Sequence, residues 1–241
     1  MKRPLWLELL AMVLIPIVGM ALGVGAMLLL NLGQADYGAL VVNLSFLAAA
    51  IGLWRVFRFS PEELALQVFQ GQIGRHLFLS LGICLLYLIF YIFAIRIAGL
   101  KPFSASTAWG LLTYFVVVVA EELYFRGILY GFLQKRFSAK TTLVVTSLLF
   151  GLFHAQQGLR GMVSRTFSGW LWGSVRYSSG MIFLLIFPVH FAYNAVWLLF
   201  EGNWNNPPLW AVYALPAVEF LIGLAIVLLG NPSPTSNQRA V

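Results

Sequence analysis

Charged residues are scarce in this sequence of 241 residues. Only 10% of the residues are charged, eight are Asp or Glu, and 61% are hydrophobic. A soluble domain typically has about 25% charged and about 45–50% apolar residues. The composition therefore excludes an ordinary soluble protein and indicates an integral membrane protein.

Several functional signatures are missing as well. The single Cys84 excludes an intramolecular disulfide, and no GxSxG or HExxH motif and no cysteine in a catalytic context is present. A serine, cysteine or zincin-type hydrolase is therefore unsupported. No cluster of Lys and Arg is dense enough to indicate a nucleic acid partner. The net charge of +7 is instead typical of membrane topology and of contact with anionic lipid.

Apolar segments separated by short polar loops fill most of the chain, and a membrane helix needs about 20 such residues. We predict an all-α transmembrane bundle of about eight spans, forming a single domain, 1–241, with a polar tail at 231–241. The segment Gln156–Gly180 is mixed in character and is either a span with a polar face or partly re-entrant; we prefer a span. The other predicted spans are Leu5–Leu32, Tyr37–Phe57, His76–Ala98, Thr107–Leu133, Thr141–Ala155, Met181–Phe200 and Leu209–Leu229.

The distribution of Lys and Arg predicts the orientation of these spans. The first apolar segment is roughly twice as long as the 7–15-residue core of a signal peptide, so we expect an uncleaved helix. Basic residues concentrate at Lys2-Arg3, at 55–75 and at 135–140, and they are absent from the first and last outer loops. Since basic loops face the cytoplasm, both termini are predicted to be cytoplasmic.

Two adjacent carboxylates, Glu121 and Glu122, follow a run of apolar residues in the fourth predicted span. A charge at the centre of a membrane helix costs about 2.5–3.5 kcal/mol on insertion scales, and such residues usually mark function. Arg126 lies four residues after Glu122, a spacing that favours an ion pair on one helix face. We therefore predict that Glu122 and Arg126 pair, which leaves Glu121 to face a cavity.

Two of the three histidines add to this constellation. His154 ends the fifth span, and His190 lies inside the seventh with Asn194 four residues later on the same face. A carboxylate and an imidazole can activate a water molecule. A second imidazole with an amide can donate hydrogen bonds to the oxyanion of a hydrolysed carbonyl.

Other interpretations fit the same residues. Polar side chains also join membrane helices as structural contacts, and this is the simpler interpretation of His154 taken by itself. A proton-coupled transporter or a channel can use Glu and His in a similar way. His76, beside Arg75 at the edge of a span, is expected to be interfacial.

Taken together, the motifs resemble a known family. EELYFR at Glu121–Arg126 matches EExxxR, FGLFH at Phe150–His154 matches FxxxH, and HFAYN at His190–Asn194 matches HxxxN. In order and approximate spacing they are similar to the CPBP family of intramembrane endopeptidases (CAAX proteases and bacteriocin-processing enzymes, also called the ABI family). The resemblance covers about Trp109 to Leu199, which we take as the catalytic core, 109–199.

This resemblance implies an eight-helix bundle with an intramembrane catalytic chamber that opens towards the cytoplasm. It implies peptide-bond hydrolysis in which Glu121 and His154 activate water, His190 and Asn194 stabilise the oxyanion, and Glu122 and Arg126 support the site. The family is often labelled a metalloprotease, but we favour a glutamate mechanism without metal. If Zn²⁺ were bound, Glu121, His154 and His190 would be its ligands.

Two classes of function therefore remain. The first is an intramembrane endopeptidase that acts on a membrane-associated protein or peptide in the lipid bilayer, by CAAX-type, leader or sorting-tail processing. We expect it to be a multi-pass protein of a bacterial inner membrane. The second is a non-enzymatic membrane protein, such as a proton-linked transporter or a bacteriocin-immunity or partner-binding scaffold.

Overall fold

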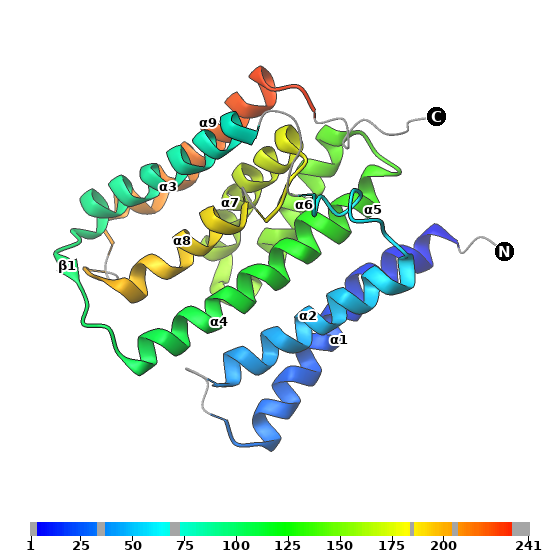
Figure 1. The fold of residues 1–241 in the computed structure, drawn as a ribbon, viewed down its shortest axis with the longest axis horizontal. Coiled ribbons are helices and arrows are strands. Elements are labelled where there is room, and N and C mark those ends of the chain that lie inside the picture. Colours follow the sequence, from blue (N-terminus) through cyan, green and yellow to red (C-terminus); the bar gives the residue numbers. More distant parts are fainter. Residues whose placement is uncertain (1–3, 33–36, 68–72, 184–185, 204–206, 233–241) are drawn as a thin grey trace.

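The apolar segments of the chain fold into a bundle of helices (Figure 1). A helix satisfies every backbone hydrogen bond within its own segment, as a hydrocarbon environment requires. The computed structural model describes residues 4–32, 37–67, 73–183, 186–203 and 207–232. In these residues the long helices are α1 (Leu5–Leu29), α2 (Ala39–Phe57), α3 (Ile73–Ile95), α4 (Ala105–Glu121), α6 (Ala139–Phe153), α7 (Gly158–Ser179), α8 (Ile186–Leu199) and α9 (Leu209–Leu229).

The fourth span is continued beyond α4 by a π-helix, η2 (Glu122–Leu129), and a short α5 (Tyr130–Gln134). Each of the eight predicted spans corresponds to a helix, and the predicted all-α membrane bundle is confirmed. Among the described residues, five helices are long and apolar enough to cross a membrane singly, and six if α6 and α7 form one broken span. The count of eight crossings stays a prediction.

Helices α1 and α2 pack closely because glycines line their contact. A Cβ atom on Gly19 would lie 2.7 Å from Ala49 Cβ, and one on Gly23 would lie 2.7 Å from Val42 Cα. Small residues at a four-residue spacing allow membrane helices to approach in this way. The start of α1 and the end of α9 lie on the same side of the bundle (Figure 1).

Helices α6 and α7 pack against each other, and their close approach also depends on glycine. A Cβ atom on Gly151 would lie 2.6 Å from Met162 O, and one on Gly173 would lie 2.5 Å from Leu143 Cδ1. The break between the two helices is a single 3₁₀ turn, η3 (Ala155–Gln157), directly after His154. The polar segment predicted as a sixth span is thus helical over 158–179.

The loop between α2 and α3 covers the π-helix from one side. Ser60 and Glu63 form a reciprocal capping box, with Ser60 N donating to Glu63 Oε2 at 2.9 Å and Glu63 N donating to Ser60 Oγ at 3.3 Å. The backbone then makes a single turn instead of a longer helix, and Leu64 and Ala65 in this turn are buried. A Cβ atom on Gly131 would lie 2.7 Å from Glu63 O, so the loop seats directly on the backbone of α5.

Short polar features fix the ends of the helices around the site. Ser104 and Ser138 cap α4 and α6, each with a side-chain oxygen that accepts from a backbone N–H three residues later at 3.2 Å. Two-residue strands β1 (Gly99–Leu100) and β2 (Phe200–Glu201) pair antiparallel and link the ends of α3 and α8.

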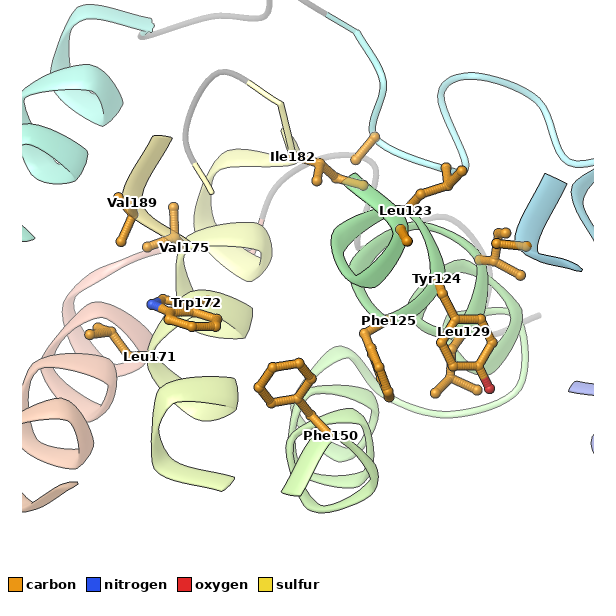
Figure 2. Packing of buried hydrophobic residues seen from close by; sticks show 14 of the residues in the cluster. Leu123, Tyr124, Phe125, Leu129, Phe150, Leu171, Trp172, Val175, Ile182 and Val189 are labelled. Atoms are coloured by element: carbon orange, nitrogen blue, oxygen red, sulfur yellow. The ribbon is translucent and has the colours of Figure 1, made fainter. Parts of the chain in front are cut away.

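The buried core is rich in aromatic rings and lies where η2, α6, α7 and α8 meet (Figure 2). Phe125 meets the ring of Phe150 edge-on, with centroids 5.0 Å apart and an interplanar angle of 90°. Phe150 in turn meets Trp172 at 5.8 Å. Edge-to-face pairs of this kind stabilise by about 0.5–1.5 kcal/mol beyond the area they bury. These aromatic rings pack around the polar side chains of the central helices.

Candidate active site

A change of helix type sets the two glutamates apart. Glu121 is the last residue of α4, and Glu122 begins the π-helix, all eight residues of which are buried. π-helical turns are rare and occur frequently at functional sites. The Glu121 side chain is 14% exposed, whereas that of Glu122 is 0% exposed. The neighbouring carboxylates therefore have different surroundings.

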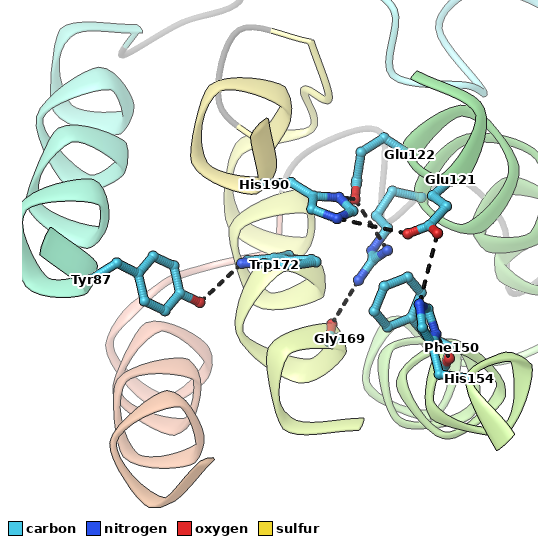
Figure 3. A network of polar contacts seen from close by, with 9 residues as sticks. Tyr87, Glu121, Glu122, Phe150, His154, Gly169, Trp172 and His190 are labelled. Carbon is cyan, nitrogen blue, oxygen red and sulfur yellow. Dashed lines mark hydrogen bonds and ion pairs between the residues drawn. The ribbon is translucent and has the colours of Figure 1, made fainter. Parts of the chain in front are cut away.

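Glu122 binds two partners through a single oxygen (Figure 3). Arg126 Nη1 donates to Glu122 Oε1 at 3.2 Å, the pairing expected from the spacing of four residues. His190 Nδ1 lies 2.8 Å from the same oxygen, a contact that the sequence did not predict. Glu122 thus links the π-helix to α8 as well as to its own next turn.

Arg126 is held on several sides. Its guanidinium carbon lies 4.2 Å from the ring centroid of Phe150 and 5.4 Å from that of Trp172, and Nη2 donates to Gly169 O at 3.5 Å. Aromatic faces attract a guanidinium, and the attraction is stronger where water is excluded. With a counter-ion in Glu122, the buried cation is compensated by surrounding groups, as a charge in this environment requires.

His154 has a defined tautomer. Its Nδ1 lies 2.8 Å from Phe150 O, and since a carbonyl oxygen only accepts hydrogen bonds, Nδ1 carries the proton. In the neutral ring the lone pair is then on Nε2. That nitrogen lies 3.7 Å from Glu121 Oε1, too long for a direct hydrogen bond.

The other imidazole approaches the second oxygen of the same carboxylate. His190 Nε2 lies 3.7 Å from Glu121 Oε2, so Glu121 lies between the two rings (Figure 3). The His190 side chain is 2% exposed, while those of His154 and Glu121 are 11% and 14% exposed. The accessible part of the cluster is therefore at Glu121 and His154, and its sealed part is at Glu122 and Arg126.

Asn194 lies one turn after His190 on α8 and is buried. Within the described part of the chain its amide makes no hydrogen bond with another residue. The structure thus brings Glu121, Glu122, Arg126, His154 and His190 into one contact network and places Asn194 on the adjoining turn. Their catalytic roles remain predictions.

Residues 103–196 match the family described as type II CAAX prenyl endopeptidase Rce1-like. The matched segment is less than half of the chain and contains all three motifs. Over these residues the chain is similar to that family, and the match supports membership of the CPBP family. A comparison with curated proteins found no match.

At the level of the family, the match supports a CAAX-type intramembrane endopeptidase that acts on a membrane-associated protein. The apolar helices and the family together also show an integral membrane protein.

The ring of His190 packs against Trp172, which belongs to a second polar cluster. Trp172 stacks on His190 with centroids 4.0 Å apart, and its Nε1 donates to Tyr87 Oη at 3.1 Å. Tyr87 Oη donates to Glu219 Oε1 at 2.7 Å, and Ser168 Oγ donates to the same oxygen at 2.8 Å. This chain of contacts connects α3, α7 and α9 to the candidate active site.

Glu219 was missed by the sequence analysis, although a signal existed. It is the one acidic residue in the apolar stretch Leu209–Leu229, and it is completely buried. The same argument that singled out Glu121 and Glu122 applies to it. Tyr87 and Trp172 carried no comparable signal, because aromatic residues are common throughout this chain.

In the described residues, no group of three or more His, Cys, Asp or Glu side chains has an arrangement that could hold a metal ion. Two zinc ligands in tetrahedral geometry at about 2.0–2.2 Å from the metal lie about 3.4 Å apart, so the separations of 3.7 Å between each histidine Nε2 and a Glu121 oxygen do not by themselves decide between water and metal. The mechanism without metal stays a prediction, and no step proposed for this site is routed through a metal.

Proposed function

We propose that this protein is an endopeptidase that hydrolyses a peptide bond near the C-terminus of a prenylated, membrane-bound protein. The observation that carries the proposal is the position of Glu121 between the two imidazoles, at 3.7 Å from each Nε2. The Rce1-like match over 103–196 supports CAAX-type cleavage in preference to processing of a leader or a sorting tail.

Glu121 and His154 together can hold the attacking water. Two acceptors 3.7 Å apart can share one water molecule that lies about 2.8 Å from each. Because Nδ1 of His154 donates to Phe150 O, its Nε2 is free to accept. The water then donates one hydrogen to Nε2 and one to Glu121 Oε1, and a lone pair on its oxygen points away towards the substrate.

If His190 is to stabilise the oxyanion, its Nε2 must carry a hydrogen. A neutral ring with Nδ1–H directed at Glu122 would leave Nε2 bare and unable to donate. Nε2 carries a hydrogen only if the ring is an imidazolium beside the Glu122 carboxylate, or if Glu122 holds the proton and Nδ1 accepts from it. In either case the Glu122–His190 pair holds one additional proton, and Arg126 and Trp172 fix the position of the two groups.

The reaction then proceeds in two steps. The water oxygen bonds to the scissile carbonyl carbon, one of its protons passes to His154 Nε2 or Glu121, and the carbonyl oxygen becomes an oxyanion. His190 Nε2–H and the Asn194 amide donate to this oxyanion. The carbon–nitrogen bond then breaks, and the proton taken from water passes to the leaving amine. The products are a new carboxylate and a free peptide.

Glu121→Gln tests the proposal, because an amide cannot take the proton although it keeps the shape of the side chain. The protein termini of whole cells are compared for wild type, Glu121→Gln and the control Glu201→Gln, which alters an exposed glutamate in β2. We expect at least one new terminus with wild type and Glu201→Gln that is absent with Glu121→Gln. A terminus formed equally by all three would contradict the assignment.

The same experiment addresses the non-enzymatic alternative. A proton-linked transporter or a binding scaffold predicts identical termini in all three cells and a difference in flux or binding. A cleavage assay with reconstituted protein and a prenylated peptide does not depend on which substrates a cell expresses. Absence of cleavage there by correctly folded wild type would reject the endopeptidase proposal.

We also propose that both termini lie on the cytoplasmic side. The bias of Lys and Arg supports this orientation, as does the common side of the start of α1 and the end of α9 (Figure 1). A reporter domain that is active only in the cytoplasm should be active when it is fused to either terminus. Opposite locations for the two reporters would contradict the arrangement.

A further inference from the structure

Another buried arginine lies next to the candidate active site and has no role in the proposed mechanism. Arg176 is in the last turn of α7, four residues after Trp172, and is 0% exposed. Its Nε donates to Arg126 O in the π-helix at 3.3 Å. One of its three nitrogen atoms therefore joins α7 to the backbone of the π-helix.

The other two nitrogen atoms of Arg176 are unpaired. Among the described residues, neither Nη1 nor Nη2 has a hydrogen-bond partner, although both are buried. Arg126 has Glu122 as its counter-ion at 3.2 Å, and the charge of Arg165 interacts with two carboxylates. Within the described part of the chain, the charge of Arg176 interacts with the phenol of Tyr130 and with no carboxylate. Arg176 is therefore a buried cation without a protein anion beside it.

Tyr130 adds a third unpaired donor. Its ring centroid lies 4.9 Å from the guanidinium carbon of Arg176. Its hydroxyl is also buried and has no hydrogen-bond partner among the residues that the structure describes. The ring packs in a cluster with Leu143, Tyr177 and Val227, none of which carries a charge. Two residues in contact thus present three unpaired donor groups.

The chemistry of these groups defines the kind of ligand that fits them. A guanidinium only donates hydrogen bonds and does not lose its proton in proteins, so its burial has to be compensated by negative charge. The C-terminal end of α7 supplies only about half an elementary charge. A water molecule can accept from Nη1 or Nη2 but brings no charge, whereas an anion both accepts and compensates the charge.

Complete burial limits the size of this anion. Both Arg176 and Tyr130 are 0% exposed. A peptide carboxylate or a lipid phosphate is attached to a long chain, which would have to pass through the packed helices. A small inorganic anion has no such attachment, and a monovalent one matches the single charge of the guanidinium.

We propose that Arg176 and Tyr130 bind a small monovalent anion of the chloride class inside the bundle. This site goes beyond the proposed function, since nothing in it depends on cleavage of a peptide. The anion compensates the guanidinium whose Nε donates to Arg126 O. It therefore stabilises the packing of α7 against the π-helix.

Thermal unfolding in detergent tests the proposal, with chloride replaced stepwise by gluconate at constant ionic strength. A ligand that binds only the folded state raises the unfolding temperature by mass action. The unfolding temperature of wild type should rise with chloride and saturate. At about 100 times the dissociation constant the rise should be roughly 5–10 °C.

Variants assign this response to the two residues. Arg176→Met removes the charge and the donors, so its unfolding temperature should not depend on chloride. Tyr130→Phe removes one hydroxyl and should raise the half-saturating chloride concentration by about 2- to 10-fold, as expected for one hydrogen bond. Arg160→Gln, which removes an exposed charge from the same helix, should retain the wild-type response.

A direct observation covers the case in which Arg176→Met does not fold. Crystals of wild type grown with bromide in place of chloride should give an anomalous peak at hydrogen-bond distance from Nη1 and Nη2 of Arg176. The proposal is overturned if that position holds ordered water without an anomalous signal. It is also overturned if folded wild type does not respond to chloride, or if Arg176→Met responds as wild type does.

Discussion

Substitution of Glu122 by Gln probes the sealed part of the site. Glutamine keeps the shape of the side chain and an acceptor oxygen but removes the charge. In the structure Glu122 Oε1 lies 3.2 Å from Arg126 Nη1 and 2.8 Å from His190 Nδ1, and the three side chains are 0–3% exposed. The substitution therefore leaves a buried guanidinium without its counter-ion and an imidazole without the group that holds its additional proton.

Two magnitudes follow from this geometry. Removing one member of a buried ion pair costs about 3–5 kcal/mol in unfolding free energy. For a protein of this length that is a fall of roughly 6–20 °C in unfolding temperature, at 2–4 °C per kcal/mol. Loss of one oxyanion donor lowers kcat by about 100- to 1,000-fold. Since the oxyanion forms only in the transition state, KM should change little.

The assay compares thermal unfolding in detergent with cleavage of a farnesylated peptide over a range of concentrations. Glu63→Gln is the matched control, because Glu63 pairs with Lys135 at 2.7 Å on the surface, with side chains 37% and 43% exposed. It should cost less than about 1 kcal/mol and leave kcat unchanged.

A double variant separates stability from catalysis. Glu122→Gln combined with Arg126→Met removes both charges of the pair, so much of the lost stability should return. The kcat should stay low, because His190 still lacks its partner. The reasoning is refuted if Glu122→Gln unfolds at the same temperature as Glu63→Gln, or if its kcat stays within about twofold of wild type.

Three further outcomes are expected. Tyr87→Phe leaves Trp172 Nε1 without its acceptor and Glu219 with one donor fewer, so it should destabilise by about 1–3 kcal/mol in thermal unfolding; an unchanged protein would show that the contacts behind His190 are dispensable. Gly151→Ala should destabilise by about 1–3 kcal/mol because its Cβ meets Met162 O, whereas Gly82→Ala, with open space around it, should not destabilise and can gain up to about 1 kcal/mol. Cleavage should survive EDTA, and loss of activity that Zn²⁺ restores would establish a metal mechanism.

Composition and hydropathy were sufficient for the fold class and for the position of the helices. The predicted spans Tyr37–Phe57 and Leu209–Leu229 agree with α2 and α9 to within two residues. The seventh was predicted from Met181, but α8 is assigned from Ile186, and residues 184–185 lie outside the described part. An apolar run marks where a helix is favourable, and it does not mark where packing ends the helix.

The sequence also identified most of the polar groups at the site. Charged and imidazole side chains are rare in an apolar chain, so Glu121, Glu122, His154 and His190 stood out singly, and the spacing of four residues predicted the contact of Glu122 with Arg126. Glu219 was as visible and was overlooked.

What the sequence by itself determined is therefore local: helices long enough for a membrane, and which residues on one helix share a face. What only the tertiary structure decided depends on contacts between helices. The contact of His190 with Glu122 and the stacking of Trp172 on His190 both join residues distant in sequence. The physical reason is that a side chain's partners are selected by packing, and packing combines segments whose spacing along the chain carries no record of their distance in space.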